Sequence, residues 1–120
     1  MDIKQIQQQL SKFASDRDWE QFHTPKNLTM ALSVEASELV EIFQWLTPEQ
    51  SSNLSDKQMV AIEEEVADVA IYLLRLCDAL SINLPDVVEN KIKVNGEKYP
   101  VDFSKGNAKK YNQRDDLISS

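Results

Sequence analysis

Residues 56–80 read DKQMVAIEEEVADVAIYLLRLCDAL, and this stretch decides the fold class. Its apolar residues recur at intervals of three and four, which is the period of an α-helix. The main apolar stripe consists of Ile62, Val66, Val69, Leu73, Leu76 and Leu80. A second apolar strip lies on another side of the same helix and consists of Val60, Ala67, Ile71 and Leu74. A helix that is apolar on two sides is buried on two sides, so the stretch predicts a helical bundle completed by a second copy of the chain.

Acidic residues border this stripe and recur in the preceding helix. Glu65 and Asp68 stand three residues apart, and Glu35 and Glu38 repeat that spacing in the segment before. Glu35 falls in the middle of its own apolar stripe, which is formed by Leu28, Leu32, Leu39, Ile42 and Leu46. A spacing of three places both carboxylates on one helix face. If the two helices pack antiparallel, the four carboxylates converge on one pocket.

Four carboxylates in one pocket cannot all stay ionised without a cation. Oxygen ligands suit Mg²⁺, with Mn²⁺ as a substitute, better than zinc. A ferritin-like di-iron site needs Glu-x-x-His on two helices, and the single histidine, His23, lies in a predicted loop. Acidic pairs are also common on solvated helix faces, so a non-catalytic helical interaction module is the alternative.

The remaining sequence predicts an all-α, four-helix arrangement. Helices are predicted over residues 2–19, 24–46, 55–80 and 85–99, with a polar linker over 47–54. The only glycines are Gly96 and Gly106, which argues against β-hairpins and glycine-rich phosphate loops earlier in the chain. We expect one domain over residues 1–100 and a solvated, mobile C-terminal tail over 101–120.

Composition narrows the classes of partner. The 120 residues include 13 Lys and Arg against 20 Asp and Glu, a net charge of −7, which predicts no nucleic-acid or anionic-membrane partner. The lone cysteine, Cys77, excludes an internal disulfide and predicts a core residue in a reducing compartment. The polar start MDIKQ is unlike a signal peptide. A cytoplasmic protein is expected.

At these residues the chain resembles the all-α nucleoside triphosphate pyrophosphohydrolases of the MazG-like superfamily, and in particular its single-domain, dCTP pyrophosphatase-like branch. The acidic pattern Glu-x-x-Glu followed by Glu-x-x-Asp matches Glu35, Glu38, Glu65 and Asp68. The surrounding motifs also match: FHTPKNL at 22–28, EIFQW at 41–45, DVAIYL at 68–73, and Lys91-x-x-x-Asn95 followed by KYP at 98–100. The ordered set covers the chain from about Trp19 to Tyr111.

The resemblance implies a reaction and roles for individual residues. The four acids would bind Mg²⁺, and the bond between the α- and β-phosphates of a nucleoside triphosphate would be hydrolysed, giving a monophosphate and pyrophosphate. Trp19, Trp45 and Tyr72 would hold the base with Asn95 nearby, and Lys91 would contact phosphate. The catalytic base assigned to the bound water is Glu38. The resemblance also implies a homodimer or homotetramer, and the dUTP and phosphoribosyl-ATP branches of the superfamily stay open.

Overall fold

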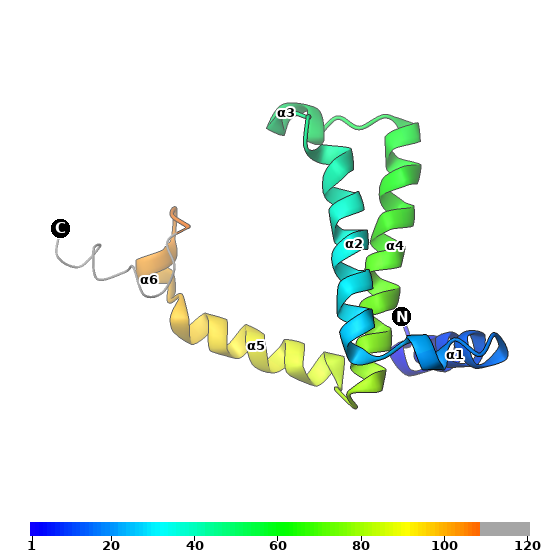
Figure 1. Cartoon of the computed structure of the whole chain (residues 1–120). Helices are drawn as coiled ribbons and strands as arrows, with labels where there is room; N and C mark the ends of the chain where they lie inside the picture. Colours follow the sequence, from blue (N-terminus) through cyan, green and yellow to red (C-terminus); the bar gives the residue numbers. More distant parts are fainter. Residues whose placement is uncertain (109–120) are drawn as a thin grey trace. The chain divides into compact units, whose positions relative to one another are not determined.

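The computed structural model describes residues 1–108, and every regular element in that range is helical (Figure 1). The chain divides into two compact units, the first comprising Met1–Ile82 and the second beginning at Asn83. The predicted all-α class is confirmed. The predicted division into a domain over residues 1–100 and a tail over 101–120 stays a prediction.

The first unit is built on two long antiparallel helices. Its elements are α1 (Ile3–Asp16), the 3₁₀ turn η1 (Glu20–Phe22), α2 (Pro25–Phe43), the short α3 (Pro48–Ser51) and α4 (Asp56–Ala79). Helices α2 and α4 lie side by side over most of their length, and α1 packs against α4 near its C-terminal end (Figure 1). The antiparallel pairing predicted from the acidic pattern is therefore present.

Side-chain caps explain where these helices begin. Asp2 accepts a hydrogen bond from the Gln5 amide at 3.1 Å, and Thr24 caps α2 ahead of Pro25. At the start of α4, Ser55 and Gln58 form a capping box, with each side chain accepting from the other residue's backbone amide. Each cap satisfies an amide that has no partner within its helix.

Two short helices were not predicted. Helix α3 lies within residues 47–54, which were predicted to be a linker, because Thr47 caps it and Gln50 completes a second capping box. The Thr47-Pro48 pair begins α3, since proline suits the first turn of a helix, and α2 has already ended at Phe43. The predicted end of the second helix at Leu46 is accordingly three residues too late.

The core of the first unit is small. Its fully buried apolar residues are Ala14, Leu28, Leu74 and Cys77, and the burial predicted for Cys77 is confirmed. Leu74 was predicted to lie on the second apolar strip, covered by another copy of the chain, and it is already only 4% exposed within the single chain. The reason is that α1 crosses α4 here, with the Gln7 side-chain amide donating to the Leu74 carbonyl at 3.1 Å. Val66 and Leu80, predicted for the inward stripe, are about half exposed instead.

The second unit contains α5 (Leu84–Lys98) and α6 (Val101–Ser104). Asn83 caps α5 by accepting from the Asp86 amide at 3.1 Å. Residues 101–104 were predicted to be tail and are helical, because Pro100 ends one helix and is the N-cap residue of the next. Residues 109–120 of the predicted tail lie outside the described residues. None of the helices within residues 1–108 is long and apolar enough to cross a membrane.

Candidate functional site

Three of the four predicted acids come together between α2 and α4. Glu35 and Glu38 on α2 and Glu65 on α4 each offer a carboxylate oxygen, and these oxygens lie within 4.8 Å of one another. The i, i+3 spacing on α2 and the antiparallel contact with α4 produce this arrangement, as the sequence predicts. The cluster brings three negative charges from two helices to one place.

Two oxygens of the cluster are buried without a donor. The Oε2 atoms of Glu35 and Glu65 are shielded from solvent and have no hydrogen-bond partner in the part of the chain that the structure describes. An ionised carboxylate oxygen in that position is costly unless a cation or a proton satisfies it. The oxygen-only donor set fits a hard divalent cation such as Mg²⁺ or Mn²⁺.

The pKa values of Glu35 and Glu65 also indicate that the cluster lacks a positive charge. Burial is the largest cause that raises the pKa of Glu35, to about 7, and the neighbouring carboxyl groups of Glu65 and Glu38 raise it further. Burial is also the largest cause that raises the pKa of Glu65, although the neighbouring Glu35 carboxyl group acts in the opposite direction. Without a cation, protons therefore take the place of the missing positive charge.

Asp68, the fourth predicted acid, lies next to the cluster but outside the three-residue group. It is half-buried, and its charge raises the pKa of both Glu35 and Glu65. Glu63 and Glu64 are exposed, as the helical rotation predicts. The structure thus separates the two acidic residues on α4 that border the α2 contact from the two that face solvent.

An apolar cavity of about 330 Å³ opens further along α4. Its lining comes from α1, from the segment between α1 and α2, and from α4: Leu10, Phe13, Ala14, Trp19, His23, Ile71, Tyr72 and Arg75. Trp19 and Tyr72, two of the three predicted base-holding aromatics, share this cavity. We call it the aromatic cavity.

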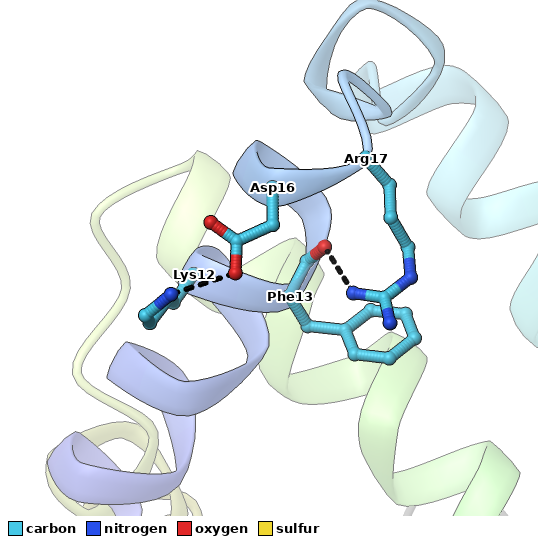
Figure 2. A network of polar contacts seen from close by, with 4 residues as sticks. All are labelled: Lys12, Phe13, Asp16 and Arg17. Carbon is cyan, nitrogen blue, oxygen red and sulfur yellow. Dashed lines mark hydrogen bonds and ion pairs between the residues drawn. The ribbon is translucent and has the colours of Figure 1, made fainter.

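Phe13 on α1 forms part of the wall of the aromatic cavity and contacts two neighbouring side chains. The ring of Phe13 meets the ring of Trp19 edge-on, with centroids 5.7 Å apart. Arg17 places its guanidinium carbon 3.5 Å from the Phe13 ring centroid and donates to the Phe13 carbonyl at 3.1 Å (Figure 2). An ion pair of 2.7 Å between Lys12 and Asp16 braces the same turn of α1 (Figure 2). The contacts with Trp19 and Arg17 hold the Phe13 ring at the cavity wall.

Sequence reasoning missed one polar residue in the cavity. Arg75 follows Tyr72 by three residues on α4, and its Nη2 lies 3.4 Å from His23 Nδ1. The only local signal is a basic residue inside the apolar run YLLRLC at 72–77. Its contact with His23 spans 52 residues of sequence, which helix periodicity does not predict.

Trp45 and the two predicted residues of α5 remain to be placed. Trp45 stands two residues after the end of α2, is 86% exposed, and is absent from the cavity lining. Lys91 and Asn95 are exposed residues of α5 and belong to the second unit. Their predicted roles stay predictions.

Comparison with known proteins gives consistent matches. The model of the MazG-like family matches residues 30–113, which include both acidic pairs. dCTP pyrophosphatase 1 of Mus musculus is 40% identical over 111 residues, covering 91% of this chain and 65% of that protein. Its Homo sapiens counterpart is 37% identical over 113 residues, covering 92% and 66%. This chain therefore spans slightly less than two-thirds of the length of these relatives.

A solved structure is also similar. The crystal structure of a pyrophosphatase from Archaeoglobus fulgidus aligns with a TM-score of 0.79 at 40% identity, covering 83% of this chain and 94% of that one. The all-helical fold of this chain is therefore similar to that of a solved pyrophosphatase, over 94% of that protein's chain.

Proposed function

Because this chain belongs to the MazG-like family, we propose that it is a nucleoside triphosphate pyrophosphohydrolase with dCTP as its preferred substrate. It cleaves between the α- and β-phosphates and releases dCMP and pyrophosphate. The observation that carries this proposal is the pair of buried, partnerless carboxylate oxygens of Glu35 and Glu65. The relatives named dCTP pyrophosphatase, at 37–40% identity, support the choice of substrate.

The metal proposed is Mg²⁺, held by Glu35, Glu38, Glu65 and Asp68. The ion supplies charge neutralisation of the triphosphate and a lower pKa for a bound water. Since the chain is acidic overall, with a net charge of −7, this local positive charge is what lets it accept a polyanionic substrate.

The chain's own residues then orient the reactants. Glu38 is proposed as the catalytic base that takes a proton from the attacking water. Trp19 and Tyr72 would hold the base in the aromatic cavity, and Trp45 would add a third aromatic. Lys91 would contact phosphate, and Asn95 would lie near the base.

A homo-oligomer is part of the proposal. Apolar side chains remain exposed on both long helices, namely Met30, Val34 and Val40 on α2 and Met59, Val60 and Val66 on α4. Soluble monomers avoid such surfaces, and a second copy of the chain related by a two-fold axis would cover them. We propose a dimer, or a tetramer built from two dimers, working in the cytoplasm.

The reaction is tested by incubating the purified chain with Mg²⁺ and a panel of deoxynucleoside triphosphates, and identifying the products. We expect pyrophosphate and a monophosphate, with dCTP turned over fastest. Orthophosphate together with a diphosphate would contradict the proposed bond cleavage. A non-catalytic helical module would give no hydrolysis and no rise in melting temperature on adding Mg²⁺, since only a bound ligand stabilises the folded state.

The acidic residues are tested by neutralising them singly. Glu38→Gln and Asp68→Asn should each abolish turnover while the helical content stays unchanged, because removing one of several clustered negative charges relieves repulsion in the metal-free protein. Glu64→Gln is the matched control on the exposed side of α4 and should keep near-normal activity. A Glu38 or Asp68 variant with most of the wild-type kcat would remove that residue from the site.

A further inference from the structure

Arg75 lines the aromatic cavity and lies on nearly the same face of α4 as Asp68, which is next to the carboxylate cluster. Asp68 and Arg75 are seven residues apart on α4, so they lie on nearly the same helix face, separated by roughly 10 Å along the axis. Tyr72, which lines the cavity, lies between them. A nucleotide with its phosphates at the cluster can therefore extend its base along this face into the cavity.

The guanidinium of Arg75 has few partners for a buried charge. The side chain is only 12% exposed, yet it carries five N–H donors. Nη2 faces His23 Nδ1 at 3.4 Å, and Nη1 faces the Asp78 carboxylate at 3.8 Å. Both contacts are longer than the roughly 2.7–2.9 Å of a strong charge-assisted hydrogen bond. Nε has no acceptor within residues 1–108 and is shielded from solvent.

His23 fits the role of a positioning residue for this guanidinium. Burial is the main cause that lowers the pKa of His23, and the charge of Arg75 lowers it further. The neutral ring can accept from Arg75 through Nδ1, whereas a protonated ring would repel it. His23 thus holds one edge of the guanidinium and leaves other donors unused.

These features define the chemistry of a matching ligand. The lining is aromatic and aliphatic apart from His23 and Arg75, so a planar, uncharged ring fits it. An arginine fork best meets two adjacent acceptors, and cytosine offers the pair O2 and N3. Uracil and thymine carry a donor at N3 in place of that acceptor. Guanine also presents an acceptor pair to arginine, but a cavity of about 330 Å³ lies at the small end of ligand sites and favours a single ring.

We propose that Arg75 is the specificity-determining residue of the aromatic cavity and selects cytosine by donating to its O2 and N3 atoms. This inference rests on the proposed function, because it takes the cavity as the base site of that reaction. It assigns base selection to a side chain that none of the sequence motifs includes.

The test compares base selectivity between wild type and Arg75→Met, which replaces the unbranched stem of the side chain and removes its charge and its donors. We expect kcat/KM for dCTP to fall by about 10- to 100-fold, in line with the loss of hydrogen bonds from a buried charged donor. The kcat/KM for dUTP should change less than about threefold, because uracil does not offer the acceptor pair that Arg75 would bind. A third substrate, dGTP, is measured in parallel, and a larger loss for dGTP than for dCTP would overturn the assignment to cytosine.

Two further variants separate recognition from structure. Asp78→Asn removes the ion pair of Arg75 but keeps its guanidinium, so it should leave the ratio of dCTP to dUTP turnover unchanged. Arg75→Lys keeps the positive charge but lacks the paired donors of the guanidinium, so it should lose most of the preference for dCTP. If Arg75→Met does not fold, this variant decides whether Arg75 selects cytosine. Equal losses for dCTP and dUTP in the Arg75 variants, or a matching loss of preference in Asp78→Asn, would overturn the proposal.

A binding measurement distinguishes this inference from the proposed function. Titrations of the metal-free protein with dCMP and dUMP, followed by calorimetry, need no turnover. Wild type should bind dCMP at least about tenfold more tightly than dUMP, and Arg75→Met should remove the difference. If wild type hydrolyses no triphosphate, the proposed function fails, while the two monophosphates still decide the role of Arg75.

Discussion

At the residue scale, the carboxylate cluster shows how far spacing alone can predict a site. Glu35 stands in the middle of an apolar stripe, and this conflict between charge and position marked it as functional. The structure brings Glu35, Glu38 and Glu65 together as that pattern predicts. Arg75 could not be found in the same way, because its partner His23 comes from the loop before α2. Contacts between distant segments depend on tertiary packing, and the periodicity of one helix does not predict them.

The raised pKa of Glu35 predicts an unusual pH dependence of stability. Its folded-state pKa of about 7 exceeds the ordinary value of 4.5, so the folded protein holds a proton that the unfolded chain releases. The contribution of this group is favourable below about pH 4.5 and is lost as the pH rises towards 7. In EDTA, the free energy of unfolding should therefore fall over this interval, as measured by chemical denaturation.

The variant Glu35→Gln isolates this contribution. It cannot titrate, so its free energy of unfolding should decline less than that of wild type between pH 4.5 and 7. Glu64→Gln, on the exposed side of α4, should keep the wild-type pH dependence. Identical slopes in Glu35→Gln and wild type would show that Glu35 is not the titrating group.

At the element scale, the helix starts were more predictable than the helix ends. The predicted starts at residues 2, 24 and 55 coincide with the N-cap residues Asp2, Thr24 and Ser55, and each of these side chains accepts from a backbone amide. The ends are harder to predict, because Pro48 and Pro100 follow two predicted helices although each also stands at the start of a further helix. A proline excludes continuation of the helix before it and equally favours a new first turn.

The capping box of α4 gives a prediction at this scale. Ser55→Ala removes the acceptor for the Gln58 amide, which lies 3.1 Å from the serine hydroxyl, and should lower the free energy of unfolding by about 1 kcal/mol. Denaturant melts at one fixed protein concentration measure the change. Ser33→Ala makes the same chemical substitution at an exposed position within α2 and should be neutral or slightly stabilising. Equal effects of the two substitutions would argue against a stabilising cap.

At the scale of the whole molecule, the small core limits what one copy can do alone. Ala14, Leu28, Leu74 and Cys77 are the buried apolar residues of the described chain, while several valines on α2 and α4 stay exposed. The two-sided apolar pattern of α4 predicted this shortage of cover, although Leu74 of the second strip is covered by α1 and not by another copy of the chain. It could not predict where α1 would pack, because the crossing point depends on side chains of both helices.

A single charge on the exposed strip tests the proposed assembly. Val60 is 57% exposed on α4 and lies outside the cavity lining, so Val60→Lys should weaken association without touching the aromatic cavity. Light scattering at micromolar concentration should show a multiple of 13.7 kDa for wild type and a smaller mass for the variant. Asn53→Lys adds the same charge at an exposed position before α4 and should keep the wild-type mass. A wild-type protein that scatters as a monomer would refute the assembly.

The burial of Cys77 has a practical consequence. It is the only thiol in the sequence, it is 4% exposed, and burial raises its pKa, so little reactive thiolate forms while the fold is closed. An alkylating reagent can then label the chain only during the moments when its interior becomes accessible. The labelling rate of the unaltered protein thus measures how often that interior opens, and an occupied nucleotide or cation site should slow it in proportion to the stability gained.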